Sequence, residues 1–151
     1  MDAKVMYAAL LVWVLLASRL VHAEQPHGKD CGDSETQGDM NACFAASAAK
    51  SQDLLDKLIL EIRPLIEAPR FAQLTSNMKL FAAFRDAHCK WEESASGGGS
   101  IGPTTYWICM DDLNWKYISE LKLHLCEGEG MTGSCTESQK YNKPAHAHSS
   151  K

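Results

Sequence analysis

The sequence places an acid, a base and a nucleophile close together at one point. Asp86, His88 and Cys89 supply a carboxylate, an imidazole and a thiol, the groups from which a cysteine nucleophile and its general base are built. Residues one or two positions apart on a helix do not face each other, however. Because Cys89 also has a ready use in a disulfide, we expect no catalytic role for this cluster.

Paired carboxylates are the second possible source of chemistry. A glycosidase holds two carboxyl groups about 5–9 Å apart across a cleft, whereas neighbouring acids on one helix diverge. The acidic pairs of this chain are Asp111 with Asp112, Glu92 with Glu93, and Glu127 with Glu129. We interpret all of them as solvated surface groups.

The remaining motifs are weak as metal or cofactor sites. Gly97, Gly98 and Gly99 are not followed by the Lys and the Ser or Thr of a phosphate-binding loop. His146 and His148 could hold copper or nickel only loosely, because they lie in a polar terminal segment. We therefore expect no metal, no cofactor and no enzymatic activity.

Two features are better candidates for binding. The glycine-rich segment 96–101 cannot be helical, because consecutive glycines are poor helix formers. It is either a plain connector or a binding loop, and a rigidly held loop gains affinity because it loses little freedom on binding. Arg85 either clamps this loop through backbone carbonyl groups, which we favour, or faces a partner.

The cysteine content predicts disulfides. The chain has six cysteines, an even number, and none of them has the C-x-x-C spacing typical of a zinc site. They are Cys31, Cys43, Cys89, Cys109, Cys126 and Cys135. Three bridges are expected, and disulfides persist mainly in exported proteins.

The first residues are typical of a secretory signal peptide over 1–23. Lys4 precedes an apolar run over 5–17, and Val21 and Ala23 suit a cleavage site after Ala23. The run is short for a bilayer span, which needs roughly 20 residues. We expect a mature chain that is periplasmic or secreted and has no membrane segment.

Charge narrows the choice of partner. The net charge of the chain is −4, which argues against nucleic acid and anionic lipid as partners. A modest acidic balance favours encounter with a basic protein, or serves only solubility.

Hydrophobic periodicity predicts helices over 36–63, 69–91 and 103–125. A capping box of Thr36 and Asp39 would begin the first, and Pro64 would end it. The apolar stripes are expected to include Leu55, Leu58 and Ile62 in the first helix, Phe81, Phe84 and Ala87 in the second, and Leu113, Tyr117 and Leu121 in the third, with Trp115 off the stripe. We expect 24–35 to be an extended leader and 136–151 a disordered polar tail.

Short connections between helices imply antiparallel neighbours, so the expected fold is an all-α, disulfide-stapled antiparallel three-helix bundle. In that topology Cys126 and Cys135 lie at the pole opposite to the other four cysteines and should pair with each other. Three connectivities then remain. We favour Cys31–Cys43 together with Cys89–Cys109, which would staple the ends of the glycine-rich segment.

Several of these pieces resemble a known family of small exported bacterial proteins, the lysozyme inhibitor LprI-like family. Residues 36–43, TQGDMNAC, are similar to its TQxEMNxC opening, and 84–89, FRDAHC, to its xRDAEC element. The resemblance covers roughly 30–125 and implies an LprI-like helical domain over 36–135. The chain departs from the family at Asn114 and Tyr117, where Thr and Arg are usual.

The resemblance implies an inhibitor that occludes the glycan-binding cleft of a lysozyme, whose two catalytic carboxylates could accept a cation or hydrogen bonds. The candidate partner-binding residues are Lys79, Arg85, Lys90, Ser96, Gly97, Gly98, Gly99, Ser100 and Ile101. Two other roles stay open. One is an immunity or adaptor protein that binds another cell-wall hydrolase or a toxin, and the other is a structural or stress protein of the envelope.

Overall fold

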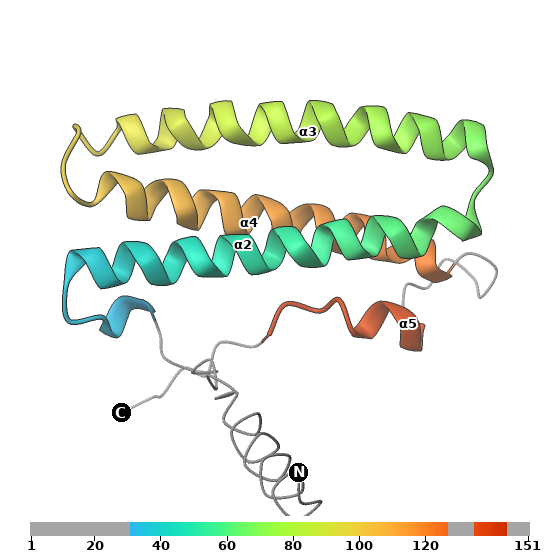
Figure 1. Ribbon diagram of the computed structural model, residues 1–151, viewed down its shortest axis with the longest axis horizontal. Coiled ribbons are helices and arrows are strands. Elements are labelled where there is room, and N and C mark those ends of the chain that lie inside the picture. Colours follow the sequence, from blue (N-terminus) through green and yellow to red (C-terminus); the bar gives the residue numbers. More distant parts are fainter. Residues whose placement is uncertain (1–30, 127–134, 145–151) are drawn as a thin grey trace, which may run out of the picture.

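The computed structural model describes residues 31–126 and 135–144 of the chain. Three long helices run up, down and up beside one another (Figure 1), so the predicted all-α antiparallel bundle is confirmed. The expected signal peptide lies outside the described residues. Within the described part, no helix combines the length and the apolar character needed to cross a bilayer.

The first long helix, α2 (Gln37–Ile62), begins where the capping signal predicts. The Thr36 hydroxyl accepts the Asp39 backbone N–H at 3.1 Å and donates to the Asp39 carboxylate at 2.6 Å. This satisfies an N–H that has no partner inside the helix. At the other end Pro64 cannot continue the helix, and the chain passes through a short 3₁₀ turn, η2 (Arg63–Leu65).

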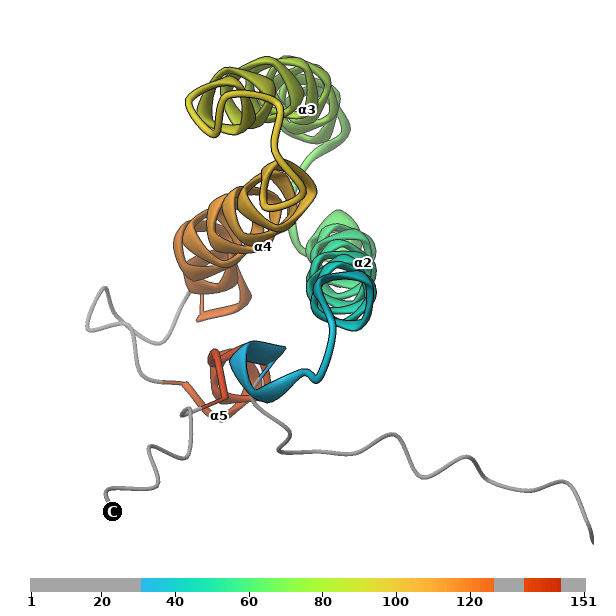
Figure 2. The ribbon, with the colours of Figure 1, turned by 90° about the vertical axis from the view of Figure 1, so that its left-hand side faces the viewer.

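The other two long helices are α3 (Ala68–Ser94) and α4 (Gly102–Leu121), the latter extended by the 3₁₀ segment η3 (Lys122–Cys126). The helix α4 is central: it packs along α2 on one side and against α3 on the other, while α2 and α3 hardly approach each other. Figure 2, which looks along the helices, shows α3 and α2 on different sides of α4. The helix α3 therefore has one main neighbour.

Three disulfides join the cysteines in the pairing favoured from the sequence. Cys31–Cys43 ties a short 3₁₀ turn, η1 (Cys31–Asp33), to the start of α2, where an extended leader was expected. Cys89–Cys109 joins α3 to α4. Cys126–Cys135 lies at the opposite end of the bundle.

The hydrophobic core lies between α2 and α4 and is closed by the C-terminal segment. Its buried side chains are Leu55, Leu58, Ile62, Trp115, Ile118, Leu121 and Tyr141. Two of these overturn sequence-based expectations. Trp115 was placed off the apolar stripe, but α4 packs on two helices, so its buried surface is wider than one stripe. The part of 136–151 that the structure describes is not a disordered tail.

That segment instead forms the short helix α5 (Thr136–Gln139) and places Tyr141, 1% exposed, in the core. Lys140 pairs with Glu61 at 2.6 Å and lowers the pKa of that carboxyl, and Lys143 pairs with Asp112 at 2.9 Å. Such surface pairs add little stability. Burial of the tyrosine ring is the main reason why the segment is ordered.

We expect Tyr141→Ala to lower the free energy of unfolding by about 3–5 kcal/mol, because it empties a fully enclosed site in the core. Urea unfolding of the oxidised protein measures this change. The matched control is Leu60→Ala, since Leu60 is 65% exposed and its truncation should change stability by about 0.5 kcal/mol or less. An unchanged midpoint for Tyr141→Ala would contradict the role of this segment in the core.

Candidate partner-binding surface

The glycine-rich segment forms a tight loop between the end of α3 and the start of α4. Backbone N–H groups of Ser96 and Gly99 donate to the carbonyls of Glu93 and Ser96 at 3.0 and 3.3 Å. Gly97 and Gly98 have φ angles of 64° and 75°, a left-handed conformation that costs glycine nothing and other residues more. The sequence of the loop therefore fits the turn that it makes.

Two contacts hold this loop on the bundle. Cys89–Cys109 joins the two helices that the loop connects, and the hydroxyls of Ser96 and Thr105 lie 3.3 Å apart. Gly97 to Ile101 are exposed, and nothing lies within 4 Å of where a Cβ would stand at Gly97 or Gly98. The loop residues predicted to bind a partner thus lie together at one end of the molecule, and all of them except the half-buried Ser96 are exposed.

Arg85 points between the helices. Its guanidinium donates from Nη1 to the side-chain oxygens of Gln52 on α2 and Asn114 on α4, and lies 5.5 Å from the ring centre of Phe81. Burial lowers the pKa of Arg85. The expected clamp on loop carbonyls is wrong, because the guanidinium lies among these side-chain amides of the neighbouring helices. Direct contact with a partner would require it to leave these acceptors.

The acceptors of Arg85 are themselves held. The Asn114 amide donates to the Ser51 hydroxyl at 3.0 Å and to the Ala48 carbonyl at 3.3 Å. The Gln52 amide donates to the Asp56 carboxylate at 2.8 Å. The polar seam (Ser51, Gln52, Arg85 and Asn114) therefore connects α2, α3 and α4 in one hydrogen-bonded unit.

The residues next to Arg85 that could do chemistry each contact a different partner. Cys89 is bridged, and the Asp86 carboxylate accepts from Lys90 at 2.8 Å and from the Tyr106 hydroxyl at 2.9 Å. Both contacts lower the pKa of Asp86. The Nε2 atom of His88 lies 3.7 Å from the Oε1 atom of Glu92. These groups serve as helix-to-helix and within-helix contacts, and no nucleophile with a neighbouring base is formed.

Both candidate lysines lie on α3 and are exposed. Lys90 is paired with Asp86 along the same helix, so part of its charge is compensated. Lys79 stands farther from the loop, nearer the middle of α3. The structure thus brings Lys90 close to the loop end and leaves Lys79 apart from it.

The structure reveals a surface that the sequence pattern missed. Leu80, Phe84 and Trp91 are 71, 56 and 66% exposed, and the His88 ring stacks on Phe84 with its centre 5.4 Å away. Spacings of four, four and three residues place these four side chains on one side of α3. We call them the outer α3 face.

Phe84 and Ala87 were expected in the core-facing stripe, and both are exposed. The reason is that α3 packs mainly against α4, through Leu74, Met78 and Phe81 among others. Only a narrow part of a helix is covered by a single neighbour, so apolar residues beside that part stay in contact with water. Exposed aromatic groups gathered in this way mark interaction sites.

Metal chemistry finds no support in the described ranges, where no three His, Cys, Asp or Glu side chains gather. The pair His146 and His148, and the pair Glu127 and Glu129, lie outside those ranges. Asp112 is paired with Lys143.

Comparison with known proteins identifies a family. A family model described as "Lysozyme inhibitor LprI" matches residues 29–121. This span contains α2, α3, the glycine-rich loop and α4. No curated protein and no solved structure matches the chain.

We expect Asn114→Ala to destabilise the protein by about 1–3 kcal/mol, because it removes one of the two acceptors of the half-buried Arg85 guanidinium and the amide that donates to Ser51. A double-mutant cycle with Arg85→Ala, followed by urea unfolding, should give a coupling energy of about 0.5–3 kcal/mol. Asn77→Ala is the control, since Asn77 is exposed on α3. Strictly additive losses would show that the polar seam does not act as a unit.

Proposed function

The chain belongs to the family described as Lysozyme inhibitor LprI, and on this basis we propose that it is an exported binding protein that inhibits a lysozyme by covering its glycan-binding cleft. The observation that carries the proposal is the family match. It covers residues 29–121 and so contains the three long helices α2, α3 and α4 in full. Inhibition by occlusion needs a rigid surface and no catalytic group of its own. We place its action in the periplasm or outside the cell.

The part of the molecule best suited to this contact is the end that carries the glycine-rich loop. Trp91 lies one turn before the end of α3, and Ile101 directly precedes α4, so two large exposed apolar side chains flank the loop. Tryptophan is enriched among the residues that dominate binding energies. A loop held by a disulfide loses little conformational freedom on binding, which favours affinity.

Phe84 and Leu80 extend this apolar surface along the outer α3 face. A partner that covers the loop and the outer α3 face together would bury aromatic anchors beside a polar rim, the usual anatomy of a stable interface. We propose this combined surface as the contact and leave Arg85 out of it, since its guanidinium is engaged between the helices.

Charge supports the encounter. The chain carries a net charge of −4, which would attract a basic lysozyme and raise the association rate at low salt. At the interface itself the inhibitor should present positive charge, because the catalytic cleft of a lysozyme contains carboxylates. Lys90 near the loop, and Lys79 farther along α3, are the candidate cations for that contact.

We expect stoichiometric inhibition when the oxidised chain is titrated into c-type and g-type lysozymes, with wall lysis and binding followed together. Trp91→Ala should weaken binding by about 2 kcal/mol, which is roughly thirtyfold in Kd. Leu60→Ala on α2 is the control, because Leu60 is equally exposed and lies outside the proposed surface.

Three outcomes separate the possibilities. Unchanged lysis with every lysozyme, together with saturable binding to another cell-wall hydrolase, would replace the proposal with the immunity or adaptor role. Inhibition that survives replacement of the segment 96–101 would remove the loop from the interface. Equal losses of affinity for Trp91→Ala and Leu60→Ala would show that the outer α3 face is not part of the interface.

A further inference from the structure

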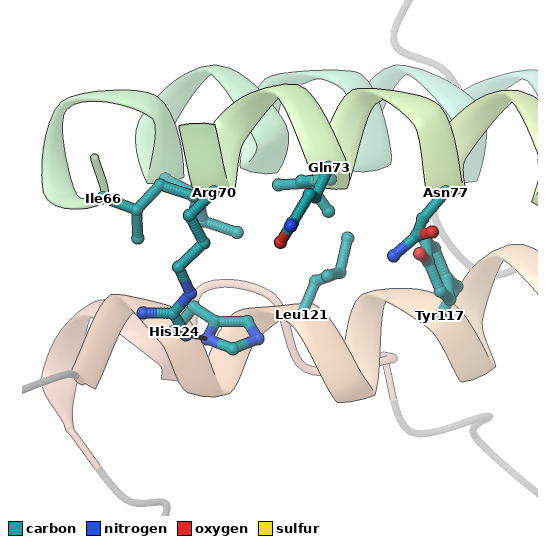
Figure 3. Close-up of a pocket in the computed structure, with 9 residues that line it drawn as sticks. Ile66, Arg70, Gln73, Asn77, Tyr117, Leu121 and His124 are labelled. Atoms are coloured by element: carbon teal, nitrogen blue, oxygen red, sulfur yellow. Dashed lines mark hydrogen bonds between the residues drawn. The ribbon is translucent and has the colours of Figure 1, made fainter. Parts of the chain in front are cut away.

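A pocket lies at the end of the bundle opposite the glycine-rich loop. It has a volume of about 220 Å³ and is formed where α2 ends, α3 begins and α4 ends (Figure 3). Its lining residues are Ile62, Ile66, Arg70, Gln73, Leu74, Asn77, Tyr117, Leu121 and His124. The volume is somewhat below that of sites for drug-sized ligands, so the pocket suits a small molecule or one group of a larger one.

The lining is divided by chemistry. Ile62 and Leu121 belong to the buried core, and Ile66 and Leu74 pack against it, so they give the pocket an apolar floor. At one end Arg70 Nη2 lies 3.5 Å from His124 Nδ1. Figure 3 shows the Arg70 side chain reaching from α3 across to His124.

Two carboxamides stand over that floor. Gln73 and Asn77 are exposed and four residues apart on α3, so they lie on one side of the helix, roughly 6 Å apart at Cβ. In Figure 3 the Gln73 side chain points toward Leu121, and that of Asn77 lies beside Tyr117. Neither carboxamide is hydrogen-bonded to another residue of the part that the structure describes.

A side-chain carboxamide has both N–H donors and a carbonyl acceptor. Two of them side by side match a secondary amide, whose carbonyl accepts from one and whose N–H donates to the other. An acetyl methyl on that amide would rest on the apolar floor beneath. Burial raises the pKa of Tyr117, so its hydroxyl stays protonated and can also donate to a ligand carbonyl.

We propose that this pocket binds the N-acetyl group of a small ligand, with Gln73 and Asn77 holding the amide and Leu74 and Leu121 contacting the methyl. Such a group occurs on amino sugars and on acetylated peptides. The site lies at the other end of the bundle from the loop and includes no residue of the outer α3 face, so it does not depend on the proposed inhibition.

Binding can be followed by NMR on the full oxidised chain, using N-acetylglucosamine and N-acetylalanine amide as probes. Glucose and alaninamide are the matched compounds without the acetyl group. We expect saturable shifts of backbone amides over 62–77 and 117–124 with at least one acetylated probe, and none with the matched compounds. The probe that binds more tightly identifies a sugar or a peptide as the source of the group.

Asn77→Leu should weaken the binding of that probe about tenfold, because it removes one partner of the amide and keeps the side-chain size. Gln139→Leu, at an exposed position on α5, is the control and should bind as the wild type does. Equal shifts with glucose and N-acetylglucosamine, no saturable shift with either acetylated probe, or equal losses in the two variants would overturn the proposal. Lysozyme inhibition by Gln73→Leu, seven residues before Leu80 and farther from the outer α3 face, should stay at the wild-type level, so the two proposals can fail separately.

Discussion

The position of α3 depends on a single cation placed between three helices. Only Cys89 of α3 is fully buried, so the helix receives little of the hydrophobic stabilisation that joins α2 to α4. Arg85 compensates for this by donating to Gln52 on one helix and Asn114 on the other. A half-buried guanidinium is costly unless its donors are used. The two hydrogen bonds from Nη1 offset part of that cost, although the buried Nε has no partner among the described residues, and they fix the direction from which α3 approaches.

Directional contacts complete the attachment of α3. The rings of Phe81 and Tyr117 stack with centres 4.2 Å apart, and Tyr106 donates to Asp86. With the Cys89–Cys109 bridge, they lie along one side of the helix. The other side needs no partner for stability, which is why Phe84 and Trp91 can remain exposed and available for binding.

Sequence patterns predicted the elements whose causes are local. The capping pair at Thr36, the break at Pro64 and the loop at Gly97 and Gly98 each depend on neighbours in the chain. The order of three antiparallel helices predicted Cys126–Cys135 and left three connectivities, of which the favoured one is confirmed. The predictions that were wrong concern burial, which depends on residues far away in the chain. The sequence around Tyr141 does not predict that its ring packs against α2 and α4, because the residues before and after it in the chain are polar.

The candidate site shows the same division. The loop was predicted, since glycines signal a turn wherever they occur, but the outer α3 face was not. Periodicity identifies apolar positions and cannot tell which of them a partner helix covers. In α3 the coverage is narrow, so Phe84 was assigned to the core together with Phe81 although only Phe81 reaches Tyr117.

The residues that carry the family resemblance are largely structural. Gln37 donates to the Thr104 hydroxyl at 2.8 Å, and Thr104 donates to Asn41, so the opening motif fastens α2 to the start of α4. Arg85 and Cys89 of the second motif fasten α3. These motif residues therefore hold the three helices together.

The burial of Tyr141 also makes the core depend on a segment outside the three long helices. The core that α2 and α4 share is closed by a residue that follows both helices in the chain, beyond the Cys126–Cys135 bridge. Without this segment, Leu55, Ile62 and Trp115 would have an open side toward water. A chain that lacked the segment after the bridge would keep all three long helices and still leave its core uncovered on one side.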